Sequence, residues 1–252
     1  MTLRLSLCRV PLRPFPRLTR LSPPCRPFHS SSRRSYNNNG FLGFLDDIPE
    51  NTVFWGIIGL NAGVFTAFWW AKQKLSVERD PSMYRWMQQN FTANWRNISS
   101  GRVWTVFTST FAHQDLPHIF FNGFTFYFMA PLTLSILGSR QFLFLYLGGG
   151  ATAQLGSTAF TNIFQNGRDP YSLGASAAIY STLSFLAFAA PRMTLLLYGI
   201  IPVPIWLAVS GIFAYDTYLT ASDKGGKTNT SAHVGGILAG AGYFFLRRFR
   251  VF

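Results

Sequence analysis

The stretch SLGASAAIY, Ser172 to Tyr180, places one serine between small residues at the head of a strongly apolar segment. Small residues in such a position let two helices approach each other closely inside a membrane. The alternative is that the hydroxyl group of Ser176 is a nucleophile. The rest of the chain is needed to choose between these two interpretations.

The composition is typical of a membrane protein. Of the 252 residues, 48% are hydrophobic and 12% are charged, and the apolar residues come in long blocks. Six of these blocks approach the roughly 20 helical residues that cross a bilayer, which predicts an all-α bundle of six transmembrane helices. The expected helices are 52–71, 117–137, 142–164, 173–190, 193–219 and 233–246.

The formal net charge of +13 is concentrated at the N-terminus. Residues 1–34 contain eight arginines and no acidic residue, so the other 14 basic and 9 acidic residues leave only +5. An Arg-rich, Ser-rich, acid-free leader is typical of an organelle transit peptide. RPFHSSSRRSY, residues 26–36, resembles the processing region of mitochondrial presequences, so we expect residues 1–36 to be removed. The alternative is a basic arm that binds anionic lipid or nucleic acid.

Both cysteines of the chain, Cys8 and Cys25, lie in this leader. The mature protein is therefore expected to contain no disulfide, no thiolate nucleophile and no cysteine metal site. A polar linker over 37–51 leads to the expected membrane domain, 52–252. We expect no cofactor and no metal, and the sequence leaves the oligomeric state open.

The connection over 72–110 mixes tryptophans with polar residues. Amphipathic rings are favoured at the membrane surface, so we expect a long interfacial loop, the alternative being a soluble loop with scattered aromatic residues. The turns around Arg140 and Arg192 and the C-terminal tail are basic and acid-free. The positive-inside rule predicts that they share one side of the membrane with the N-terminus.

Polar side chains at membrane depth are functional hypotheses by default. His118 and Asn122 are four positions apart, so both lie on one helix face and can donate hydrogen bonds to one point. His233 begins HVGGILAGAGYFF, in which Gly236 and Gly240 have the GxxxG spacing that permits a close helix approach. We expect this helix to meet the small surface that follows Ser176.

Such a contact would pair Ser176 as the nucleophile with His233 as its general base. His118, Asn122 and the backbone N–H of Ser176 would stabilise the oxyanion. Tyr180 would pack on the imidazole and orient it. Each residue also has an ordinary alternative: Ser176 in helix packing, the His118–Asn122 pair in an interhelical hydrogen bond, and His233 as a helix cap. His113, in a polar loop, would be solvated or structural.

Taken together, these motifs resemble the rhomboid intramembrane serine proteases. The matching residues are His113, HIFFN (118–122), LGSRQF (137–142), GASAAIY (174–180) and AHVGGILAG (232–240). They follow the order of the family, and SLGASAAI with SAHVGG is most similar to its mitochondrial branch.

The resemblance implies a six-helix core with a water-filled cavity on the side of the first long loop. It implies a catalytic dyad of Ser176 and His233, oxyanion contacts from His118 and Asn122, and supporting roles for Tyr180, Gly174 and His113. In the mitochondrial members the cavity faces the intermembrane space. Their substrates are single-pass inner-membrane proteins, including dynamin-like GTPases and peroxidase precursors, and no nucleic acid is expected as a partner.

Three positions depart from the family pattern. Ala177 follows the serine where glycine is usual, Thr105 follows Trp104 where arginine is common, and Leu134 stands near a common glutamate. The extra N-terminal helix of the mitochondrial branch is also not expected here. These departures affect the scaffold and gating more than the chemistry.

A triad would need a carboxylate, and two aspartates, Asp216 and Asp223, precede His233. Neither spacing compels contact with the imidazole, so a dyad oriented by Tyr180 is preferred. Two rival functions stay open: a catalytically inactive rhomboid-like protein that binds membrane proteins, and a small transporter.

Overall fold

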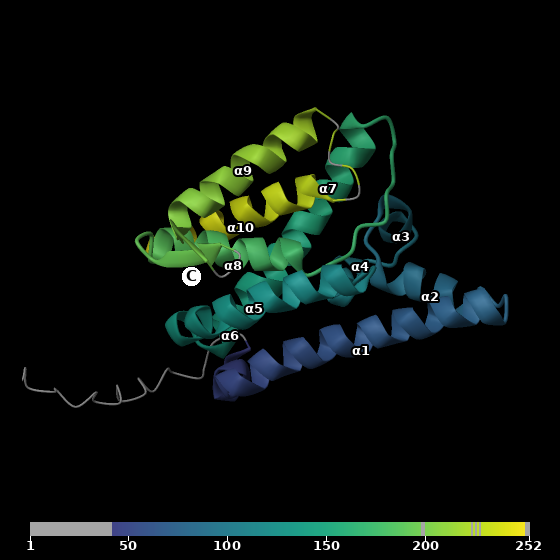
Figure 1. The fold of residues 1–252 in the computed structure, drawn as a ribbon, viewed down its shortest axis with the longest axis horizontal. Coiled ribbons are helices and arrows are strands. Elements are labelled where there is room, and N and C mark those ends of the chain that lie inside the picture. The colour runs from purple at the N-terminus through teal and green to yellow at the C-terminus, as the bar shows by residue number, and fades with distance from the viewer. Residues whose placement is uncertain (1–41, 198–199, 223, 225, 227, 250–252) are drawn as a thin grey trace, which may run out of the picture. The chain divides into compact units, whose positions relative to one another are not determined.

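The structure is a computed structural model that describes residues 42–249 except 198–199, 223, 225 and 227. The leader predicted over 1–36 lies outside the described residues. The chain consists of helices with one small two-stranded sheet (Figure 1). The α-helices are α1 (Glu50–Val77), α2 (Ser82–Phe91), α3 (Trp95–Ser99), α4 (Thr105–Thr108), α5 (Leu116–Leu137), α6 (Ser139–Leu143), α7 (Gly149–Phe164), α8 (Ser176–Ala189), α9 (Ile205–Ala221) and α10 (Thr230–Arg248). Short 3-10 helices, η1 (Gly43–Asp47) and η2 (Ser109–Phe111), and a π-helical turn, η3 (Phe144–Gly148), complete the helical elements.

Each of the six expected apolar segments contains a helix, but their lengths differ. By length and composition, α1 with 28 residues and α5 with 22 could cross a membrane, whereas the apolar helix α8 has 14 residues. At 1.5 Å per residue, α8 is about 21 Å long, shorter than a hydrocarbon core of about 30 Å. Large apolar side chains stay exposed along α5: Phe120, Phe121, Phe124, Tyr127 and Phe128. An exposed apolar surface of this kind fits contact with lipid.

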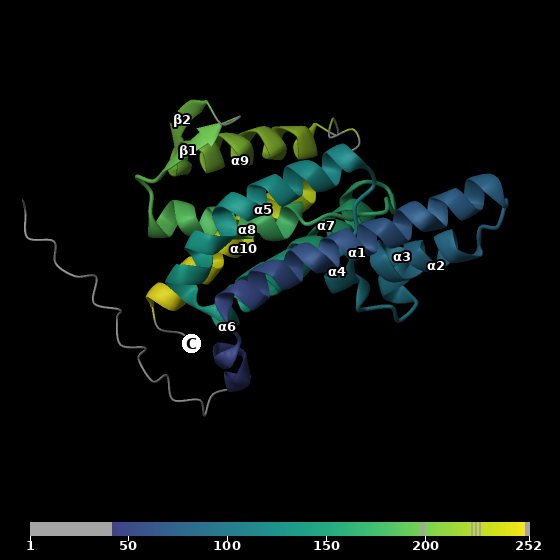
Figure 2. The same cartoon turned by 60° about the horizontal axis from the view of Figure 1, so that its bottom comes forward.

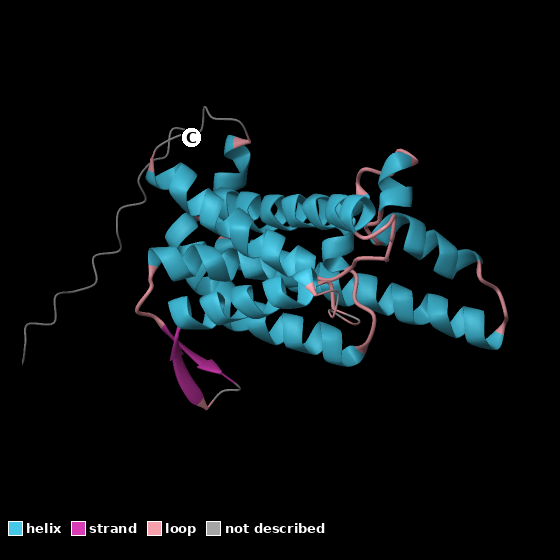
Figure 3. Cartoon of the chain, turned by 90° about the horizontal axis from the view of Figure 1, so that it is seen from above, coloured by secondary structure: helices cyan, strands magenta, loops and turns pink. Residues whose placement is uncertain are grey.

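The prediction of one continuous helix over 193–219 was wrong. Its first part is an antiparallel hairpin of β1 (Thr194–Leu197) and β2 (Ile201–Pro204), which Figure 2 shows beside α9 and Figure 3 shows in magenta. Proline lacks the amide N–H that a helix interior needs, and Pro202 and Pro204 both stand in β2. The helix therefore begins at Ile205, after Pro204 in its extended conformation.

The connection between α1 and α5 is structured over most of its length. It forms α2, α3, α4 and η2, and the side chain of Asn94 caps α3 by accepting the Asn97 N–H at 3.0 Å. Met87 of α2 packs with Phe68 and Ala71 of α1 in a small apolar cluster. Its position at a membrane interface stays a prediction.

Helices α8 and α10 approach each other as the small residues predicted. A Cβ atom added at Gly236 or Gly240 would overlap the backbone carbonyl oxygens of Ala177 and Ser181. The helix α10 also packs on α7 and α9, and Figure 1 shows α8 and α10 side by side. This close approach sets the distance between the first residue of α8 and the first turn of α10, where Ser176 and His233 lie.

Candidate active site

Ser176 is the first residue of α8, and the backbone that leads to it is firmly held. The Gly174 N–H donates to the Ser109 carbonyl at 2.9 Å, and the Ala175 N–H donates to Nε2 of His113 at 3.4 Å. Gly174 has a φ of 127°, a conformation that side chains disfavour. Any Cβ there would also lie 2.8 Å from Nε2 of His118. Only glycine therefore permits this turn into the serine.

Ser176, His233 and Asp216 form a continuous hydrogen-bonded chain. Nε2 of His233 lies 3.0 Å from Oγ of Ser176, and Nδ1 lies 2.9 Å from Oδ2 of Asp216. Both His233 and Asp216 are buried. A carboxylate can only accept a hydrogen bond, so we assign the imidazole proton to Nδ1, which faces Asp216. The other nitrogen, Nε2, is then the acceptor for the serine hydroxyl.

The preference for a dyad without a carboxylate partner therefore needs correction. Asp216 lies 17 positions before His233, across a loop, and sequence spacing did not reveal the contact. One signal was present, because a carboxylate inside an apolar segment is costly unless it is paired. Tyr180 does contact the imidazole as expected, with ring centroids 4.5 Å apart in an edge-on arrangement. Asp216 and Tyr180 therefore both contact the imidazole of His233 and fix its orientation.

His118 and Asn122, the two residues expected at the oxyanion, have different contacts in the structure. The ring of His118 packs against Gly174, two residues before Ser176, while its backbone N–H is capped by Asp115 at 2.8 Å. The Asn122 side chain donates through Nδ2 to the His118 carbonyl at 2.9 Å, within its own helix. An amide has two N–H groups, so one such contact leaves a second donor. An oxyanion role for either residue stays a prediction.

His113 is buried, so the alternative of a solvated loop residue was wrong. Burial, and to a smaller extent the neighbouring His118, lower the pKa of His113 to about 4. The two rings meet edge-on with centroids 4.9 Å apart. A neutral imidazole keeps an acceptor nitrogen, as the contact with the Ala175 N–H requires. His113 therefore supports the backbone next to Ser176.

Ala177 stands where the resemblance leads one to expect glycine, and it is buried in the structure. It is buried in a cluster with Ala153 of α7 and Ala232 of α10. Its methyl group therefore fills space between helices. Thr105 and Leu134, the other two departures, are buried as well.

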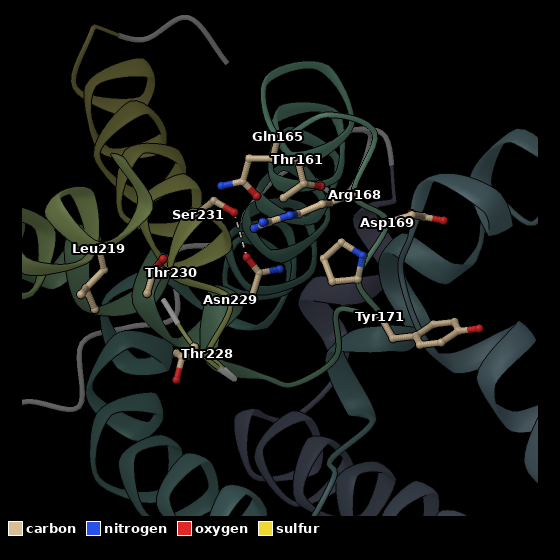
Figure 4. Close-up of a pocket in the computed structure, with 12 residues that line it drawn as sticks. Thr161, Gln165, Arg168, Asp169, Tyr171, Leu219, Thr228, Asn229, Thr230 and Ser231 are labelled. Carbon is tan, nitrogen blue, oxygen red and sulfur yellow. Dashed lines mark hydrogen bonds between the residues drawn. The ribbon is translucent and has the colours of Figure 1, made fainter. Parts of the chain in front are cut away.

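A cavity of about 570 Å³ opens beside the start of α10 (Figure 4). The end of α7, the segment 168–171 and residues 228–231 line it, and its wall is largely polar. Figure 4 shows Asn229 and Ser231 on this wall, joined by a hydrogen bond of 2.8 Å. Among the described residues, no group of three His, Cys, Asp or Glu side chains comes together as a metal site.

A serine, a histidine and an aspartate in this order of contacts form the arrangement of serine hydrolases. The family model of the Rhomboid domain matches residues 100–249, which is more than half of the chain. The chain belongs to the rhomboid family.

Several relatives carry the same family name. The chain is 30% identical over 237 residues to RHOMBOID-like protein 12, mitochondrial, of Arabidopsis thaliana, covering 86% of this chain and 65% of the relative. It is 31% identical over 194 residues to Presenilin-associated rhomboid-like protein A, mitochondrial, of Danio rerio, covering 75% and 46%. It is 25% identical over 197 residues to Rhomboid protein 1, mitochondrial, of Saccharomyces cerevisiae, covering 77% and 53%. The chain thus spans about half to two thirds of the length of these relatives.

Proposed function

We propose that this protein is an intramembrane serine endopeptidase that cleaves single-pass membrane proteins in or near their membrane anchors. The observation that carries the proposal is the 3.0 Å contact between Oγ of Ser176 and Nε2 of His233. A weakly nucleophilic hydroxyl becomes reactive when an adjacent base can take its proton, and this geometry permits that transfer. Membership of a family of membrane proteases supports the same reaction.

The reaction begins when Nε2 of His233 takes the hydroxyl proton of Ser176 while Oγ attacks the scissile carbonyl carbon. The tetrahedral intermediate collapses to an acyl-enzyme, and the imidazolium gives its proton to the leaving amine. Water, activated by the same imidazole, then releases the carboxylate product and restores Ser176. Asp216 stabilises the imidazolium in both halves of the reaction.

The negative charge of the intermediate falls beside the start of α8. The backbone N–H of Ser176 is at this helix terminus, where the helix dipole favours an anion. We assign the side-chain donors to His118, which packs on Gly174, and to Asn122, one helical turn further along α5. Donors aimed at charge that develops only in the transition state accelerate the chemical step.

We place the enzyme in the mitochondrial inner membrane, with the active site toward the intermembrane space. The support is the acid-free arginine leader and the mitochondrial names of the relatives. In this proposal residues 1–36 are removed on import. The six apolar segments then form the membrane bundle, in which α8 starts below the membrane surface and reaches only part of the way across.

Labelling with a fluorophosphonate probe tests the proposal. Such a probe reacts with an activated serine and needs no knowledge of the natural substrate. We expect the wild-type protein, purified in detergent, to be labelled and the Ser176→Ala and His233→Ala variants to stay unlabelled. Ser181→Ala is the matched control, because Ser181 lies on the same helix but bonds to backbone carbonyls. Absence of labelling in the wild type would instead favour an inactive membrane-protein binder.

A further inference from the structure

The segments that carry Ser176 and His233 are joined by a polar side chain outside the reacting groups. We propose that Asn229 is a positioning residue, which holds the serine and the histidine at reacting distance through its hydrogen bond to Ser172. The inference rests on the proposed protease function and assigns two further residues to it. Ser172 and Asn229 each lie four positions before the residue that they position.

Asn229 fixes the turn of α10 that contains His233. Its Oδ1 accepts the backbone N–H of Ala232 at 3.0 Å, which is an N-terminal helix cap. Its backbone carbonyl accepts the N–H of His233 itself at 3.3 Å. The orientation of the imidazole therefore depends on where Asn229 is held.

Ser172 fixes the segment that leads to Ser176. Its backbone N–H and carbonyl both pair with Ala93, at 2.8 Å in each direction. Its hydroxyl donates to Oε1 of Gln154 in α7 at 2.6 Å. Ser172 and Gln154 are both buried, so these contacts are shielded from water.

The hydrogen bond from Nδ2 of Asn229 to Oγ of Ser172, 2.7 Å long, joins these two fixed points. Helix capping alone does not explain this arrangement, since a serine or aspartate caps a helix about as well as asparagine. The amide offers both on separate atoms: Oδ1 accepts for the cap while Nδ2 donates to Ser172. Asparagine at position 229 thus serves two segments at once.

The Asn229–Ser172 hydrogen bond matters because the packing of α8 on α10 sets how closely the two helices approach, whereas Ser172 and Asn229 fix the segments that lead into them. A displacement of about 1 Å between reacting groups lowers a rate by roughly 10²-fold. Loss of the Asn229–Ser172 hydrogen bond should therefore reduce turnover by about 10- to 100-fold while the fold persists. Substrate affinity should change little, because neither side chain is assigned a contact with the scissile bond.

Two variants each remove one partner of the Asn229–Ser172 hydrogen bond. Asn229→Ser keeps an oxygen that can cap α10 but is too short to reach Ser172. Ser172→Ala removes the acceptor and leaves the cap intact. Ser157→Ala is the matched control, because Ser157 donates to Oδ1 of the same asparagine at 2.8 Å and does not take part in the bond to Ser172.

The measurements are kcat and KM for a single-pass substrate, the rate of fluorophosphonate labelling, and the thermal midpoint of each variant. We expect Asn229→Ser and Ser172→Ala to lower kcat and the labelling rate by about 10- to 100-fold at unchanged KM. The double variant, with both substitutions, should be no slower than the slower of the two single variants. The control Ser157→Ala should stay within about twofold of the wild type.

Three outcomes are decisive. Wild-type rates in both Asn229→Ser and Ser172→Ala would overturn the positioning role and leave the protease proposal intact. Equal losses in Ser172→Ala and Ser157→Ala, in parallel with the thermal midpoint, would show a purely structural network and also overturn it. A wild-type protein without Ser176-dependent labelling would overturn the proposed function itself.

Discussion

Oδ2 of Asp216 lies 2.9 Å from Nδ1 of His233, on the side of the imidazole opposite Ser176. The aspartate comes from α9 and the histidine from α10, so the contact also joins two helices. A buried carboxylate beside an imidazole stabilises the cation that forms when the serine gives up its proton. The relationship extends the proposed pair of catalytic groups to three.

Asp216→Asn should lower kcat by at least about 10²-fold and leave KM nearly unchanged. An amide donor facing Nδ1 favours the wrong tautomer, and the equivalent change in a serine protease triad costs about 10⁴-fold. Steady-state kinetics of Asp216→Asn and of Tyr180→Phe measure this effect. Tyr180→Phe is the control, because it keeps the ring that contacts His233. Full activity in Asp216→Asn would show that the carboxylate only joins the helices.

Gly236→Ala should severely lower the thermal midpoint and abolish labelling of Ser176. The added methyl group would overlap the Ala177 carbonyl, and backbone cannot move aside as a flexible side chain can. Gly242→Ala on the same helix is the control, because a Cβ there meets nothing within 4 Å. Replacing glycine in a helix with alanine otherwise adds up to about 1 kcal/mol of stability. Equal thermal midpoints for the two variants would contradict the close approach of α8 and α10.

Local patterns predicted the parts of this site that depend on neighbouring residues in the chain. Small residues after Ser176 and the glycines after His233 were sufficient to predict that their helices meet, as the structure bears out. The contact with Asp216 depends on the course of a loop between two helices, and no periodicity encodes it. The hairpin before α9 was missed because its apolar residues resemble a membrane segment, although its two prolines indicated an extended chain.

Acid should destabilise the protein through His113. Its pKa is lowered from 6.5 to about 4, mainly because burial disfavours the charged form. A depressed histidine pKa contributes stability that is present above pH 6.5 and is lost as the pH falls toward 4. The full effect corresponds to about 3 kcal/mol.

Thermal midpoints between pH 7.5 and 4 measure this loss. His113→Gln keeps a neutral acceptor near the Ala175 N–H but does not titrate, so its midpoint should fall less steeply over the same range. The difference between the two proteins isolates His113 from His118 and Asp115, which face it. Parallel curves would mean that other groups cause the acid sensitivity.

Asn122→Ala tests the assignment of the oxyanion donors. If its second N–H donates to charge that develops only in the transition state, kcat should fall by roughly 10²–10³-fold with little change in KM. The substitution also removes the hydrogen bond to the His118 carbonyl, so a control must reproduce that loss. Thr125→Ala does so, because Thr125 bonds to the Phe121 carbonyl one turn back on the same helix, at 2.9 Å. Similar kinetics for the two variants, or a raised KM at unchanged kcat in Asn122→Ala, would remove Asn122 from the oxyanion site.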